Sequence, residues 1–226
     1  MKPRTHCFLQ QPEIVLAHAE EGIALSEEHG FAEWIPWSRF NRGWALAQLG
    51  QVAEGVAEMT EGIAGFERLG GVPFQRFSIA LLAHGHARLG RHSEALAMLD
   101  QALEHVERSG EFDGQPEMLR LKGEILLMGG VPLVGREPKD HKPLLDGNRN
   151  VFAAEQCFRS ALEVARAQEA KWWELRATTS LARLLRDTAR QDEARTMLAK
   201  IYNWFTEGFD TADLIDAKAL LDELSA

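Results

Sequence analysis

Residues 82–103 read LAHGHARLGRHSEALAMLDQAL, with small and large apolar side chains on both sides of Gly90. Before and after this glycine, apolar residues return at the three- and four-residue intervals of an amphipathic helix. Gly90 fits the left-handed position just beyond a helix end, because glycine has no Cβ that would clash there. The stretch therefore predicts two helices joined by a tight turn.

The same pattern recurs when the chain is shifted by 40 residues. Two sets of glycines follow this interval and are expected to end helices: Gly30, Gly70 and Gly110, and Gly50, Gly90 and Gly130. Small residues also recur inside the predicted helices, in the facing pairs Gly43 and Gly55, Ala83 and Ala95, Gly123 and Ala154, and Ala182 and Ala194. Small side chains at a crossing allow two helices to pack closely. The second members of these pairs are 40, 59 and 40 residues apart, so one loop carries 59 − 40 = 19 additional residues.

Seven positions around residue 95 resemble the small and large sites of the tetratricopeptide repeat: Leu82, Ala83, His86, Gly90, Ala95, Leu99 and Ala102. We therefore predict an all-α, tetratricopeptide-like helical-repeat solenoid with repeats of about 40 residues and a C-terminal capping helix. The expected domain is a single one, residues 1–226. It consists of a half repeat at 12–30, repeats at 33–70, 75–110, 115–169 and 172–208, and a capping helix at 211–224.

The helices expected within these repeats are 12–28, 33–49, 52–68, 75–89, 92–108, 115–129, 151–167, 172–188, 191–206 and 211–224. The third repeat contains the inserted loop 131–149, where Pro132, Pro138 and Pro143 argue against regular structure. The first helix has no predicted partner on its outer side and no cap. This asymmetry suggests a segment taken from the C-terminal end of a longer protein.

The net charge, the cysteines and the distribution of apolar residues limit the classes of function and the cellular location. A net charge of −9 argues against non-specific nucleic-acid binding, although this net charge does not exclude a local basic patch. The two cysteines, Cys7 and Cys157, lie far apart and are expected to be reduced thiols. Since neither a long apolar run nor a signal peptide is evident, we expect a cytoplasmic protein without membrane contact.

Four further stretches resemble one family: Leu119–Leu127 (LRLKGEILL), Ala154–Ala165 (AEQCFRSALEVA), Glu174–Arg186 (ELRATTSLARLLR) and Tyr202–Leu224. The family is the C-terminal tetratricopeptide region of large bacterial proteins that also carry a class III adenylate or guanylate cyclase domain and an ATPase domain. The most specific stretch is Trp204–Leu214 (WFTEGFDTADL), whereas Glu169 stands where the family favours glycine. The resemblance implies a regulatory or sensory segment of a signalling protein.

The sequence gives little support for a catalytic or metal-binding site. His84 and His86 are two residues apart, so they face different sides of a helix, whereas a ligand pair needs a spacing of four. His86 is better explained as a packed core residue. The glycine-rich stretch at 129–135 lacks the lysine and hydroxyl of a phosphate-binding loop. We therefore expect no enzyme activity, no cofactor and no metal.

The residues expected to bind a partner project from the first helix of each pair, which lines the inner groove of tetratricopeptide arrays. They are Asn41, Trp44, Gln48, His84, Arg88, Arg120, Glu124, Arg176, Arg183 and Arg186. Polar and cationic side chains at these positions could hold an extended acidic peptide or a C-terminal carboxylate. The partner is expected to be a protein or peptide, among which the ATPase and cyclase domains of a parent chain are candidates.

Two alternatives to this interpretation stay open. One is a receptor that holds a small ligand or peptide in the groove near Trp44 and His84. The other is self-assembly through the uncapped first helix, for which a homodimer is the simplest form.

Overall fold

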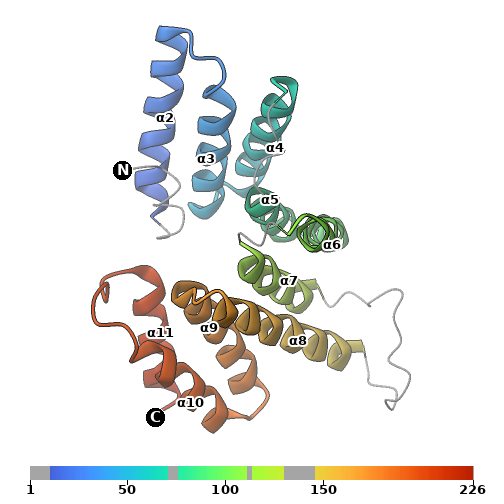
Figure 1. Ribbon diagram of the computed structural model, residues 1–226, viewed down its shortest axis with the longest axis vertical. Helices are drawn as coiled ribbons and strands as arrows, with labels where there is room; N and C mark the ends of the chain where they lie inside the picture. The colour runs from blue at the N-terminus through green and yellow to red at the C-terminus, as the bar shows by residue number, and fades with distance from the viewer. Residues whose placement is uncertain (1–10, 71–75, 111–113, 130–145, 226) are drawn as a thin grey trace. The chain divides into compact units, whose positions relative to one another are not determined.

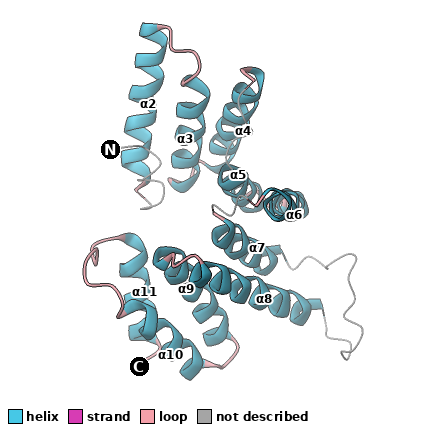
Figure 2. Cartoon of the chain, in the orientation of Figure 1, coloured by secondary structure: helices cyan, strands magenta, loops and turns pink. Residues whose placement is uncertain are grey.

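The computed structural model describes residues 11–70, 76–110, 114–129 and 146–225, and all regular structure within these ranges is helical (Figures 1 and 2). The helices are α2 (Pro12–His29), α3 (Ile35–Gln48), α4 (Val52–Arg68), α5 (Arg76–Arg88), α6 (His92–Ser109), α7 (Gln115–Gly129), α8 (Asp146–Ala167), α9 (Lys171–Asp187), α10 (Gln191–Tyr202) and α11 (Ala212–Glu223). This confirms the all-α prediction. No helix in the described ranges is both long enough and apolar enough to cross a bilayer.

The chain divides into two compact units, Met1–Met98 and Leu99–Ala226. In the first unit α3 packs against α2, α4 and α5. In the second unit α7 packs against α8 and α9, α8 against α9, α9 against α10, and α11 against both α9 and α10. Each unit is described separately below, and the single repeat domain stays a prediction.

Close packing of α3 and α4 explains two of the recurring small residues. A Cβ on Gly43 would lie 2.6 Å from the carbonyl oxygen of Gly55 and 2.6 Å from the amide nitrogen of Met59. Backbone atoms cannot move aside as a flexible side chain can, so only glycine fits at this crossing. In the second unit the aromatic ring of Phe158 occupies the corresponding space over Gly123.

The glycines that the repeat interval marks as helix ends have the expected conformation. Gly50 and Gly90 have φ values of 96° and 81°, in the region that side chains with a Cβ avoid. Glu169 and Ala189 occupy the same kind of position after α8 and α9, with φ values of 53° and 61°. The register predicted from the glycines therefore extends to two positions where no glycine is present. Gly130 lies outside the described residues.

Three boundaries differ from the predicted ones by two residues or more. Residues 146–149 were expected to belong to the inserted loop, but they form the first turn of α8. Gly147 suggested a loop there, yet one glycine costs a helix only about 1 kcal/mol, which packing against α7 can offset. The remainder of the insert, up to residue 145, lies outside the described residues. In addition, α10 ends at Tyr202 rather than at 206, and α3 begins at Ile35 rather than at 33.

Candidate partner-binding face

In the first unit, the predicted groove residues of α3 are mostly interior. Trp44 is only 4% exposed and belongs to a core cluster with Val15, Phe40 and Met59. Asn41 is also buried, and its side-chain amide donates a hydrogen bond to the carbonyl of Trp37 at 2.9 Å. Trp44 was expected to project from the surface, but three helices pack around α3, so this face of α3 is covered. Gln48, at the last turn of α3, is exposed.

Arg88 of α5 has a defined structural contact. Its Nη1 donates a hydrogen bond of 2.7 Å to the carbonyl of Ala47 near the C-terminus of α3. A cation at a helix C-terminus satisfies a free carbonyl and interacts favourably with the helix dipole. His84, on the same helix, is partly buried. His86 is 7% exposed, which confirms that it packs in the interior. Within the described ranges, no group of three or more His, Cys, Asp or Glu side chains is arranged to hold a metal ion.

In the second unit, Arg120 of α7 lies at the centre of a polar cluster. Its Nε and Nη2 donate hydrogen bonds of 2.7 and 2.8 Å to the two carboxylate oxygens of Glu117. Its Nη1 donates to Glu124 and, at 3.2 Å, to the hydroxyl of Ser180 on α9. The Ser180 hydroxyl in turn donates to Glu124 at 2.9 Å. These contacts link α7 to α9 through side chains that are largely hidden from solvent.

Arg176 links α9 to the closing helix α11. Its Nε donates a hydrogen bond of 2.9 Å to Asp213, and its Nη1 lies 3.5 Å from Glu117. The guanidinium also lies over the ring of Trp173, 5.4 Å from the ring centroid. Asp213 is only 9% exposed, and its carboxylate points at Arg176.

Two more arginines of α9 reach α11 nearer to solvent. Arg183 pairs with Asp216, and Arg186 donates a hydrogen bond of 2.6 Å to Glu223. Arg186 also donates to the neighbouring Asp187 at 2.9 Å. Together with Arg120 and Arg176, these arginines and their partners make up what we call the charged ladder of α7, α9 and α11.

Carboxylates outnumber guanidinium groups in the charged ladder. Burial alone would lower the pKa of Arg120, but the charges of Glu117 and Glu124 outweigh it, and the pKa lies above its ordinary value. The ladder holds four arginines, and they contact six carboxylates: Glu117, Glu124, Asp187, Asp213, Asp216 and Glu223. The cationic groove expected from the sequence is therefore neutralised in this unit, because its arginines already bind carboxylates of the same chain.

The sequence analysis did not predict most of the carboxylates that pair with these arginines. Glu117 and Glu124 flank Arg120 at spacings of three and four, which place side chains together on one helix face. This spacing could have indicated the pairing on α7. Asp216 and Glu223 are seven residues apart, two turns along the same side of α11. That spacing marks an acidic edge but cannot say which helix lies opposite.

Models of known protein families give no match to this chain, and a search of curated proteins gives none either. The resemblance to the repeat region of cyclase and ATPase proteins therefore stays an expectation drawn from the sequence.

Proposed function

We propose that this chain is a protein-interaction module of the tetratricopeptide type, in which about 40-residue helix pairs form a solenoid. It binds a protein or peptide partner through the first helices of its pairs, and in the second unit this surface is the outer edge of the charged ladder. The recurrence of left-handed helix ends at one register, including Glu169 and Ala189, supports a repeat architecture.

The observation that carries the proposal is the preorganisation of this edge. Arg183 and Arg186 are 40% and 33% exposed, yet each is held by a carboxylate on α11. Side chains that are already ordered lose less conformational entropy when a partner binds. Arginine is also among the residues that most often dominate the binding energy of protein interfaces.

The wider role follows from the sequence resemblance. We propose a cytoplasmic regulatory or sensory segment, bacterial in origin and without catalysis or a cofactor of its own. Its action would be on ATPase or cyclase domains of a parent protein. Because the arginines of the ladder are neutralised, the partner is not selected by free positive charge on α9. Surface complementarity to the fixed ion pairs would select it.

Binding variants test this proposal. A partner would first be identified by chemical cross-linking and mass spectrometry, and then purified and titrated against the chain. Replacing Arg186 by alanine should weaken binding by about 2 kcal/mol, roughly thirtyfold, if this side chain is central to the interface. The matched control is Arg108→Ala on α6, since Arg108 is exposed and its contacts are a surface ion pair with Glu104 and a long hydrogen bond to the backbone carbonyl of the same residue. Equal effects of the two substitutions would contradict the proposed face.

Self-assembly through the first helix remains a second candidate because α2 has an apolar outer edge. Ile14 and Leu25 are 40% and 46% exposed, and their spacing of eleven residues, three turns, places them on one side of α2. Sedimentation of the natural chain and of Leu25→Glu distinguishes this candidate. A concentration-dependent increase in mass that the substitution abolishes would support it, whereas a monomer at all concentrations would rule it out.

A further inference from the structure

A pocket of about 580 Å³ lies between α10 and α11, apart from the charged ladder. From α10 and its end, Arg195, Lys200 and Tyr202 line it, and from α11 the lining includes Lys218 and Asp222. Its volume falls in the range of sites for small molecules, roughly 300–1,000 Å³. The space is therefore larger than a single inorganic ion needs.

The charge of this pocket is opposite to that of the whole chain. Three basic side chains, Arg195, Lys200 and Lys218, line it together with one carboxylate, Asp222. The lining residues sum to +3 − 1 = +2, and Asp192, which pairs with Arg195, reduces this to +2 − 1 = +1, whereas the chain as a whole carries −9. A locally positive pocket attracts small anions by electrostatic steering.

The basic side chains of the pocket differ in whether they form an ion pair. Lys218 forms an ion pair with Asp222 at 2.5 Å, and Arg195 lies 3.2 Å from Asp192 one turn before it. Lys200 is exposed and has no carboxylate within ion-pair distance in the described part of the chain. Its ammonium group therefore keeps all three donors available to a ligand.

Hydroxyl, amide and apolar groups complete the lining. Tyr202 and Asn203 supply a phenol and an amide, both able to donate hydrogen bonds. Ala199 and Leu221 supply the apolar surface, and the Tyr202 ring adds to it while resting 5.7 Å from the ring of Phe209. Positive groups, neutral donors and an apolar wall together suit a ligand with an anionic head and a small carbon body.

We infer that this pocket binds a doubly charged organic anion, with a phosphate monoester as the best fit. Its phosphate group is held by Lys200 and Lys218, and its carbon body lies against Tyr202 and Leu221. Charge-assisted hydrogen bonds from lysine to phosphate are stronger than those between neutral groups. Lys200 supplies the unpaired positive charge, and Lys218 divides its donors between Asp222 and the ligand. Because α10 and α11 share the ligand, its binding stabilises their contact.

Calorimetric titration at low ionic strength tests the inference with three probes. Phenyl phosphate carries both the anionic head and the apolar body, inorganic phosphate carries only the head, and phenol only the body. We expect saturable binding of phenyl phosphate, weaker binding of inorganic phosphate and no measurable binding of phenol. Added salt should weaken the binding of phenyl phosphate. Absence of saturable binding at millimolar phenyl phosphate would overturn the inference.

Two substitutions with opposite expected signs locate the site. Lys200→Gln should weaken phenyl phosphate binding about five- to tenfold, since it removes the unpaired ammonium. Asp222→Asn should tighten it, because the only carboxylate of the lining is lost and Lys218 is released. The matched control is Arg91→Gln, an exposed cation of the first unit that should leave binding unchanged. Equal weakening by Lys200→Gln and Arg91→Gln, or no gain from Asp222→Asn, would place the anion elsewhere and refute the pocket.

Discussion

Arg176 on α9 and Asp213 on α11 form an ion pair whose two side chains are only 6% and 9% exposed, with Nη2 lying 2.8 Å from the carboxylate. Both charges have been removed from water, and each is the other's nearest opposite charge, while Glu117 lies 3.5 Å from Arg176 on its other side. Within the charged ladder, the pair of Arg176 and Asp213 is the least exposed ion pair between α9 and α11.

Removing either partner should therefore destabilise the second unit strongly. Arg176→Ala or Asp213→Ala is expected to lower the free energy of unfolding by about 3–5 kcal/mol, because the buried charge that remains loses its nearest opposite charge. Urea denaturation measures this loss, and hydrogen exchange in α9 and α11 shows where it acts.

The double variant Arg176→Met with Asp213→Leu separates charge compensation from simple loss of packing. Apolar residues of similar volume often replace a buried pair without loss of stability. The double variant should recover most of what each alanine loses. If the double variant is no more stable than the single alanine variants, the pair stabilises the fold by more than mutual charge compensation.

Trp44 provides a second prediction, which the structure revises. The sequence placed Trp44 in the partner-binding groove, where a substitution acts on binding rather than on stability. Because the ring is buried in the core of the first unit, the substitution should cost about 3–5 kcal/mol. Trp34, which is 59% exposed just before α3, is the matched control and should cost less than about 1 kcal/mol as alanine. Comparable melting temperatures for the two variants would contradict the observed burial.

A third prediction concerns Glu169 and Ala189, whose left-handed conformations are strained for residues with a Cβ. Glu169→Gly and Ala189→Gly should each stabilise the chain by about 0.5–1 kcal/mol. Relief of roughly 1–2 kcal/mol of strain exceeds the added entropy of the unfolded chain. The control is Ala219→Gly, an exposed position inside α11, where glycine should instead destabilise by about 1 kcal/mol. Melting temperatures that fall in all three variants would show that no strain is stored at residues 169 and 189.

The helix register could be predicted from the sequence because it depends on local backbone requirements. A helix end that needs positive φ selects glycine, and a close crossing selects a residue with little or no side chain. Gly90 and Gly43 therefore indicate a helix end and a close crossing without knowledge of the overall fold. The same register marked Glu169, and the structure extends it to Ala189, although neither residue would suggest a left-handed turn by itself.

The surroundings of the candidate site could not be predicted in the same way, because they depend on which helices face each other. Periodicity places Trp44 on one side of α3, but whether that side is groove or core is decided by the helices packed around it. Likewise, Arg183 and Arg186 look like free cations in the sequence. Only the position of α11 against α9 brings Asp216 and Glu223 to them.

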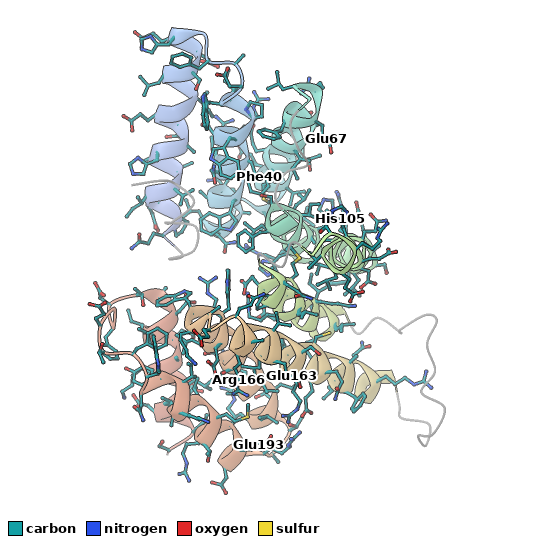
Figure 3. The ribbon with its side chains drawn as sticks, in the orientation of Figure 1. Phe40, Glu67, His105, Glu163, Arg166 and Glu193 are labelled. Carbon is teal, nitrogen blue, oxygen red and sulfur yellow. The ribbon has the colours of Figure 1, made fainter. Side chains whose placement is uncertain are left out.

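Glu174 gives the fourth prediction, a change in stability with pH. Burial alone would raise its pKa, but hydrogen bonds from Lys171 and Arg166 (labelled in Figure 3) outweigh burial, so the folded pKa lies below its ordinary value. A lowered carboxylate pKa contributes stability that is present above the unfolded value of about 4.3 and is lost as pH falls through the folded one. Glu174→Gln should therefore destabilise the chain at pH 7, with a difference from the natural chain that shrinks below about pH 4. The control is Glu163→Gln on α8, an exposed carboxylate without an ion pair in the described structure, which should change the stability at pH 7 by less than about 0.5 kcal/mol. A Glu174→Gln difference that stays constant from pH 7 to pH 3 would mean that this carboxylate acts through packing alone.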